Sequence, residues 1–120
     1  MLYLIGLKNC DTTRKARKWL EERRENYAFV DLQEEPLSND EIDELVFKVG
    51  LDTLVNKRSR TYRDLKGDES VNMESDEALK QALTVHQKMI KRPVLVRGES
   101  VLVGFDEDSW ASFLQPIDDK

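Results

Sequence analysis

The stretch LYLIGLKNCDTTRKARKWLEERRENYAFVDL, from Leu2 to Leu32, decides the fold of this chain. Its first part, Leu2 to Leu7, is almost continuously apolar and predicts a short buried strand. Thr12 to Arg24 places apolar residues at helical spacing and predicts a helix. Tyr27 to Leu32 is aromatic and β-branched, which favours a second strand. Together they predict a βαβ unit with parallel strands and a right-handed crossover.

The middle of the chain predicts a helical segment. In LSNDEIDELVFKVG, residues 37–50, Ser38 and Glu41 have the spacing of a capping box, and Gly50 is a helix stop. The polar and basic stretch that follows predicts a turn and a brief helix ending near Gly67. ESDEALKQALTVHQKMI, residues 74–90, predicts a further helix with Ser75 as its N-cap.

The last third returns to the strand pattern. PVLV (93–96) and SVLVGF (100–105) predict a hairpin, and DEDSWASFL (106–114) predicts a helix capped at Asp106. QPIDDK (115–120) is expected to be a frayed tail. A βαβ half and a ββα half around a mixed four-stranded sheet, with a helical insertion between them, predict an α/β, thioredoxin-like fold. We expect one domain over residues 1–120.

Composition limits the classes of function. The chain is 39% hydrophobic and 36% charged, with a net charge of −5, which argues against direct binding of nucleic acid. Its apolar stretches are too short to cross a membrane, and no signal peptide is visible. One cysteine cannot form an internal disulfide, and one cysteine and one histidine do not make a structural zinc site. We therefore expect a cytoplasmic protein with no metal.

Cys10, the one cysteine, lies where the first apolar run has ended and the first helix begins. An unpaired cysteine is often an inert, buried residue. At a helix N-terminus, however, the unpaired N–H groups favour a thiolate, and the thiol pKa should fall toward about 6–7. Basic residues crowd the same turns, and they favour a nearby anion: Arg14, Lys15, Arg17 and Lys18. Alternatively, they form a solvated face paired with later acids.

The neighbouring residues narrow the chemistry of a reactive Cys10. Position 13 is Thr13, so the chain lacks the second cysteine of a dithiol oxidoreductase, although a hydroxyl can donate a hydrogen bond to a thiolate. His86 is the one available histidine, and nothing in the sequence places it beside Cys10 as a base. The pattern therefore predicts a monothiol mechanism that an external thiol such as glutathione completes.

The chain resembles the ArsC/Spx family of thioredoxin-fold proteins, closest to its YffB-like subgroup. The resemblance covers nearly all 120 residues. Its anchors, in order, are KNCDTTRKARKWLEE (8–22), PLSNDEIDEL (36–45), VNKRSRTYRDL (55–65), IKRPVLV (90–96) and LVGFDEDSWASFL (102–114).

The resemblance assigns roles to three residues. Cys10 matches the nucleophilic cysteine of the arsenate reductases, and Arg92 matches an arginine that binds oxyanion and stabilises the thiolate. Pro93 matches the cis-proline beside the active cysteine. Two further arginines of those enzymes align with Asn56 and Gly104, which removes oxyanion contacts.

The resemblance and the missing arginines together favour a glutathione-dependent thiol reductase, with glutaredoxin as a further partner and no bound cofactor. Arg58 and Arg60 are the nearest substitutes for the arginine lost at Asn56, and Arg58 and Arg92 are expected to hold a glutathione carboxylate. Thr12 and Thr13 are expected near the sulfur. The alternative interpretation of Arg58, Arg60 and Arg63 is a solvated basic loop paired with nearby acids.

Two other functions stay open. Spx regulators bind the C-terminal domain of the RNA polymerase α subunit and commonly carry C-x-x-C as a redox switch, so the resemblance also implies a regulatory protein without enzymatic activity. Plain arsenate reduction is the third reading, and the arginines missing at Asn56 and Gly104 weaken it.

Overall fold

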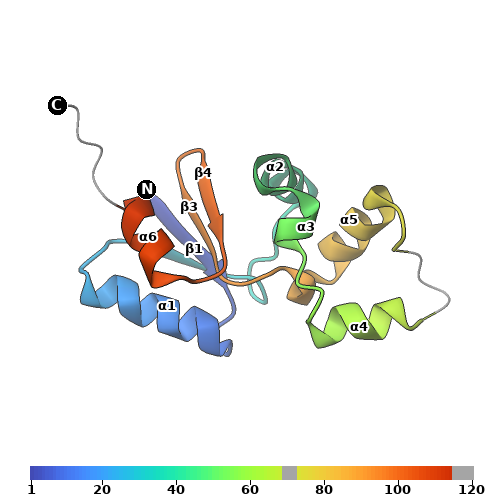
Figure 1. Cartoon of the computed structure of the whole chain (residues 1–120), viewed down its shortest axis with the longest axis horizontal. Coiled ribbons are helices and arrows are strands. Elements are labelled where there is room, and N and C mark those ends of the chain that lie inside the picture. Colours follow the sequence, from blue (N-terminus) through green and yellow to red (C-terminus); the bar gives the residue numbers. More distant parts are fainter. Residues whose placement is uncertain (69–72, 115–120) are drawn as a thin grey trace.

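The protein is an elongated α/β molecule (Figure 1), seen in a computed structural model that describes residues 1–68 and 73–114. Its longest and shortest extents are 54 and 24 Å. In chain order the elements are β1 (Leu2–Gly6), α1 (Asp11–Glu22), β2 (Ala28–Asp31), α2 (Asn39–Val49), α3 (Leu51–Leu54), α4 (Arg60–Lys66), α5 (Asp76–Val85), the 3-10 helix η1 (Gln87–Met89), β3 (Val94–Arg97), β4 (Ser100–Val103) and α6 (Glu107–Leu114).

The four strands form one mixed sheet in the order β2-β1-β3-β4. β1 and β2 are parallel, with Gly6 opposite Asp31 at their ends, whereas β1 pairs with β3 and β3 with β4 in antiparallel fashion. This is the predicted arrangement of a βαβ half and a ββα half. The thioredoxin-like α/β fold with a helical insertion is confirmed.

Two hydrophobic cores lie on opposite faces of the sheet. The smaller one packs β1 and β3 against α1 and α6 through Leu2, Leu4, Ala16, Leu20, Leu95, Trp110 and Leu114. The larger one joins the other face to the insertion that runs from α2 to η1, and it includes Ile5, Ile42, Leu54, Leu83 and Met89. Figure 1 shows the resulting shape, with the sheet, α1 and α6 at one end and the helices α2 to α5 at the other.

The predicted helix caps are present. Ser38 and Glu41 form a full capping box: the Glu41 N–H donates to Ser38 Oγ at 3.1 Å, and the Ser38 N–H donates to Glu41 Oε1 at 2.8 Å. Ser75 accepts from the Ala78 N–H, and Asp106 accepts from the Ser109 N–H. The starts of α2, α5 and α6 were therefore readable from local sequence alone.

Two helix ends differ from the prediction. α1 ends at Glu22 because Arg24 turns into the left-handed region, with φ of 58°. The helix expected to continue to Met89 ends at Val85, and η1 follows. The cause is Gln87. Its side-chain amide accepts from the Leu37 N–H at 2.8 Å and donates to the Leu37 carbonyl at 2.7 Å, which holds residues 87–89 in a 3-10 turn and not in a continued α-helix. The predicted tail, 115–120, lies outside the described residues.

Candidate active site

Cys10 is the N-cap of α1, directly after the turn that leaves β1. Its backbone is extended, with φ of −87° and ψ of 123°. Its N–H donates to the Leu7 carbonyl at 3.1 Å, and its carbonyl accepts the first helical bond, from Arg14, at 2.9 Å. The side chain is partly exposed and makes no capping hydrogen bond. The thiol is thus held at the helix N-terminus and remains accessible to a reactant.

Thr13, three residues after Cys10 in the first turn of α1, is fully buried. Its hydroxyl has no hydrogen-bond partner within the described part of the chain. It packs against Gly6, the last residue of β1, so closely that a Cβ on Gly6 would lie 2.6 Å from Thr13 Oγ1. Only glycine leaves room for this contact, since real Cβ atoms do not approach a neighbour so closely. Gly6 therefore lets the start of α1 settle onto the end of the strand.

Arg92 reaches the same place from the other half of the chain. Its Nη1 donates to the carbonyl of Lys88 at 2.7 Å and, less closely, to that of Ile90 at 3.4 Å. Its Nε is buried and has no partner among residues 1–68 and 73–114. The peptide bond from Arg92 to Pro93 is cis, as the resemblance implied, and Pro93 is buried.

These groups set the acidity of the thiol. Burial is the largest single influence and raises the pKa of Cys10, but the hydroxyl and N–H of Thr13 and the side chain of Arg92 together outweigh it. The net result is a pKa below the ordinary value of 9.0. Among the described residues, the Thr13 hydroxyl and the Arg92 Nε have no full hydrogen-bond partner, so both are free to favour the thiolate.

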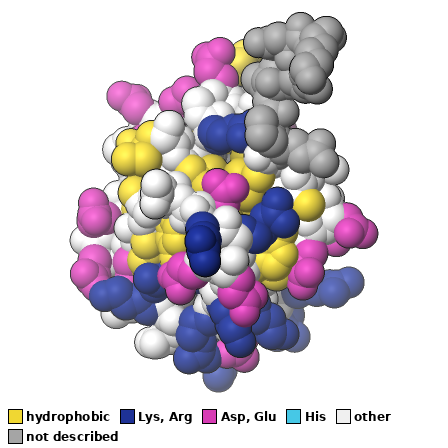
Figure 2. Space-filling view, turned by 90° about the vertical axis from the view of Figure 1, so that its left-hand side faces the viewer, with side chains coloured by type: hydrophobic (Ala, Val, Ile, Leu, Met, Phe, Trp, Pro, Cys, Tyr) yellow, Lys and Arg dark blue, Asp and Glu magenta, His cyan; other side chains and the backbone are white. Residues whose placement is uncertain are grey.

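The basic residues of α1 do not supply this effect. Arg14 pairs with Asp11, and Arg17 donates to the Tyr27 hydroxyl and stacks on the Phe29 ring, 4.2 Å from its centroid. Figure 2 shows Lys and Arg side chains gathered over the α1 end of the molecule, where Lys15 and Lys18 are exposed. The alternative of a solvated, partly paired face therefore describes these residues better than a thiolate-stabilising cluster.

The other predicted site residues lie in more open positions. Thr12 is exposed on the first turn of α1, unlike its buried neighbour Thr13. Arg58 is exposed in the turn before α4. Arg60, whose side chain is 91% exposed, faces Asp64 at 3.9 Å. No contact joins Arg58 or Arg60 to Cys10 within the described residues, so their part in binding stays a prediction.

Asn56 and Gly104, the two positions where arginines are missing, each have a structural role in the local backbone. Asn56 accepts the Arg58 N–H with its side-chain oxygen at 3.0 Å and forms a local turn. Gly104 has φ of 83°, in the left-handed region that favours glycine. Its N–H donates to the Pro93 carbonyl at 2.8 Å, and its carbonyl accepts from Trp110 Nε1 at 2.9 Å. An arginine at 104 would strain this backbone.

Sequence reasoning missed Gly6, because its role depends on how closely α1 approaches the strand. Within the described ranges, no group of three His, Cys, Asp or Glu side chains is arranged to hold a metal ion. The same residues include no helix long and apolar enough to span a bilayer.

Comparison with known proteins gives consistent matches. The chain is 39% identical over 104 residues to YusI of Bacillus subtilis, covering 84% of this chain and 87% of that protein. It is 31% identical over 118 residues to the global transcriptional regulator Spx of the same organism, covering 95% and 87%. The solved structure of the YFFB protein superposes with a TM-score of 0.89 at 33% identity, covering 96% of this chain and all of that one.

The family comparison agrees with the fold and with the order of the sequence anchors. The ArsC family matches residues 5–113, which include the Cys10 turn, the insertion, the Arg92–Pro93 step and most of α6. The chain belongs to the ArsC family.

Proposed function

We propose that this protein is a glutathione-dependent thiol reductase with Cys10 as its nucleophile. One observation carries the proposal: the Thr13 hydroxyl and the Arg92 Nε are both buried and lack partners within the described residues, and the side chains of these two residues lower the pKa of Cys10. Leaving a buried donor unpaired costs about 1–3 kcal/mol. Two such donors beside one thiol are explained if they stabilise the negative sulfur during a reaction.

The proposed cycle needs one protein thiol. The Cys10 thiolate attacks one sulfur of a substrate disulfide; a bond forms to that sulfur, the substrate S–S bond breaks, and the second sulfur leaves as a thiolate that takes a proton from water. The thiolate of glutathione then attacks the substrate sulfur bound to Cys10. This releases the Cys10 thiolate and a disulfide of substrate and glutathione. Because position 13 is Thr13, no internal cysteine competes for this second step.

The remaining predicted residues receive supporting roles in the same proposal. Arg92 and Thr13 hold the thiolate, and Pro93 forms the wall beside it. Arg58, exposed in the turn before α4, and Arg60, exposed at the start of α4, contact the acidic co-substrate, and Thr12 lies on the exposed side of α1. Glutathione is a co-substrate, glutaredoxin can accept its mixed disulfides, and the cytoplasm, which is rich in glutathione, is the expected compartment.

The rate of Cys10 alkylation by iodoacetamide against pH tests the proposal. We expect an inflection below the ordinary thiol value in the wild type, a shift upward in Arg92→Ala, and slower alkylation in the presence of glutathione. A small mixed disulfide supplied with glutathione measures turnover directly. An inflection at or above the ordinary value that ignores Arg92 would contradict the proposal.

A second candidate function rests on the likeness to Spx over 95% of this chain. In that case the protein is a regulator that binds the RNA polymerase α subunit, and Cys10 is a sensor or has no chemical role. A pull-down with purified α subunit separates the two, because the reductase needs no such contact. Arsenate reduction, the third reading, lacks the arginines at Asn56 and Gly104, and arsenate turnover with glutathione and glutaredoxin measures it.

A further inference from the structure

A hollow of about 330 Å³ opens beside the turn that carries Cys10. Its walls come from the turn Leu7, Lys8 and Asn9, from the end of β2 with the loop after it, and from Lys88 of η1. Both sides adjoin the site, since Leu7 bonds the Cys10 N–H and Lys88 bonds Arg92. The volume falls near the lower end of the roughly 300–1,000 Å³ typical of small-molecule sites.

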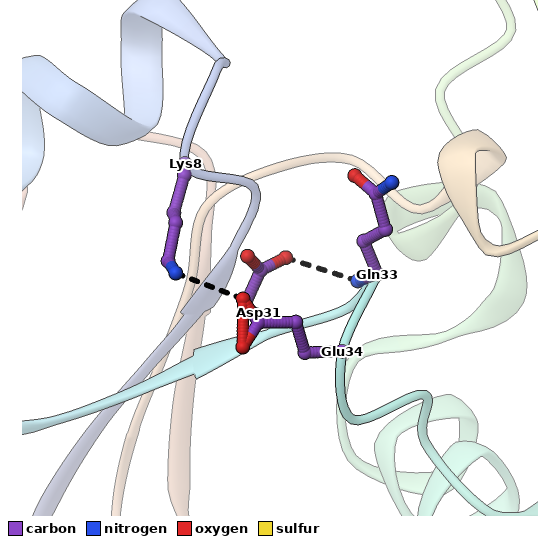
Figure 3. Close-up of polar contacts among 4 residues, drawn as sticks. All are labelled: Lys8, Asp31, Gln33 and Glu34. Carbon is purple, nitrogen blue, oxygen red and sulfur yellow. Dashed lines mark hydrogen bonds and ion pairs between the residues drawn. The ribbon is translucent and has the colours of Figure 1, made fainter.

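Asp31 is the buried charge of this hollow. It is only 8% exposed, and its carboxylate accepts one hydrogen bond, from the Gln33 N–H at 3.0 Å (Figure 3). Lys8 is close enough to feel the negative charge of Asp31, but its ammonium forms an ion pair with Glu34, at 2.8 Å, and not with Asp31. Within residues 1–68 and 73–114, Asp31 forms no ion pair. A carboxylate withdrawn from water with a single neutral donor is a ready acceptor for a cationic group.

Lys88 supplies the opposite charge from a different element. Its side chain is exposed, and it makes no ion pair in the part of the chain that the structure describes. Lys8 and Glu34, which also line the hollow, neutralise each other as an ion pair. The hollow therefore offers one uncommitted carboxylate and one uncommitted ammonium, which match a ligand group that carries both an ammonium and a carboxylate.

The position of the hollow selects among ligands of this kind. Cys10 itself does not line it, although the three residues before Cys10 do. The charged end of the ligand must therefore be separated from a sulfur that reaches Cys10. In free cysteine the ammonium and carboxylate are too close to the sulfur for this, whereas the γ-glutamyl arm of glutathione provides the needed spacer.

We propose that the hollow binds the γ-glutamyl end of glutathione, with Asp31 receiving its α-ammonium and Lys88 its α-carboxylate. The inference rests on the proposed function, because it places the co-substrate of that reaction. The binding step involves no bond making or breaking. It would orient the tripeptide so that its thiol points toward a mixed disulfide on Cys10, which favours attack by raising the local concentration of the thiol.

Binding of S-methylglutathione, followed by NMR titration, tests the site without any thiol chemistry. In the wild type we expect shifts confined to the amides of residues 7–9, 31–34 and 88, with clearly weaker binding of S-methylcysteine and of the tripeptide analogue that lacks the α-ammonium. Asp31→Asn keeps the shape and the bond from Gln33, and it should weaken binding about 5- to 20-fold. Lys88→Gln, at an exposed position, should weaken it about 3- to 10-fold.

Asp43→Asn is the matched control. Asp43 pairs with Lys80 at 2.8 Å on the helical insertion and does not line this hollow, so the affinity should stay unchanged. Equal affinity of wild type, Asp31→Asn and Lys88→Gln, or shifts located elsewhere, would overturn the proposed site. Should Asp31→Asn fail to fold, Lys88→Gln and the analogue without the ammonium decide the question on the wild-type fold.

The two proposals fail in distinguishable ways. Loss of binding in Asp31→Asn with a normal alkylation profile of Cys10 supports the site, because the thiol then stays activated. An ordinary thiol in the wild type, together with S-methylglutathione bound at residues 7–9 and 31–34, would overturn the reductase and leave the binding site in place.

Discussion

The chain carries arginines in two regions that look alike in sequence and differ in structure. Arg92, before the cis-proline, is partly buried, and its Nε is left without a partner among the described residues. Arg58 and Arg60, before and within α4, are exposed, and Arg60 faces an acid of its own helix. An exposed arginine costs the fold almost nothing, whereas an unpaired buried donor is destabilising. The comparison teaches that the cost of leaving a donor unpaired, more than its charge, distinguishes the region around Arg92, where we place the proposed reaction.

The largest expected effect comes from removing the thiol. Cys10→Ser should reduce turnover of a mixed disulfide with glutathione to the uncatalysed rate, because the chain has no second cysteine that could form the intermediate. The measurement is initial-rate kinetics, with circular dichroism to confirm folding. Turnover above background would show that Cys10 is not the nucleophile, and the region of Arg92 would then have no functional advantage over that of Arg58 and Arg60.

Arginine substitutions compare the two regions directly. Arg92→Ala should raise the pKa of Cys10 and lower kcat/KM about 10- to 100-fold at neutral pH, since the thiolate loses a charged donor. Arg58→Ala and Arg60→Ala should leave the pKa of Cys10 unchanged and raise KM for glutathione at most a few-fold, as expected for exposed contacts. The pH profile of alkylation and steady-state kinetics give both quantities. An equal shift in the pKa from Arg58→Ala would show that the regions act alike.

Gly6→Ala should disturb the buried side of the site. The new Cβ would meet the Thr13 hydroxyl at 2.6 Å, so α1 must move away from the end of β1. We expect the free energy of unfolding to fall by about 1–3 kcal/mol, together with a higher pKa for Cys10. Gly67→Ala is the control, because its Cβ would meet only ordinary contacts at 3.6 Å. Urea unfolding and the alkylation profile report the two effects separately.

Thr13→Val separates function from stability. The substitution keeps the shape but removes the donor, so the pKa of Cys10 should rise and thiolate reactions at neutral pH should slow by about tenfold. The free energy of unfolding should stay the same or increase, since the buried hydroxyl has no partner to lose in the described structure. Thr12→Val, on the exposed side, should change neither quantity. A large loss of stability in Thr13→Val would mean that its hydroxyl has a structural role.

The smallest expected effect is a pH dependence of stability. The pKa of Cys10 is lowered in the folded protein, so between that value and about 9.0 the unfolded chain binds more protons. The contribution to stability is therefore complete above the unfolded pKa and is lost as the pH falls through the folded pKa. The difference in unfolding free energy between the wild type and Cys10→Ser should drift in this direction between pH 6 and 9. A flat difference would contradict the lowered pKa.

Much of the fold was predictable because its signals are local. The strand, helix and strand between Leu2 and Asp31 follow from periodicity, and the capping box at Ser38 from a four-residue pattern. The end of α5 was not predictable in this way. Nothing around Val85 forbids a longer helix, and the tie between Gln87 and Leu37 depends on a loop far away in the sequence.

The candidate site shows the same division. Cys10 could be singled out from its place before a helix, and Arg92 from its step before Pro93. The sequence also placed the Thr13 hydroxyl near the sulfur. It could not show that Gly6 allows the close approach of Thr13, or that the Thr13 hydroxyl and the Arg92 Nε lack partners among the described residues. Asp31 was likewise read only as a strand residue, since its burial beside the Cys10 turn comes from the parallel pairing of β1 and β2.

The N-cap position of Cys10 has an evolutionary consequence. Serine, threonine and aspartate cap helices there, and replacing one of them by a non-capping residue costs about 1 kcal/mol. Cys10 forms no such bond, so serine at this position should make a firmer helix than the native residue. One nucleotide change separates the two codons. Selection for stability alone would thus favour serine at this position. If Cys10 has the proposed function, a descendant that has lost this function should carry serine there and have a higher melting temperature.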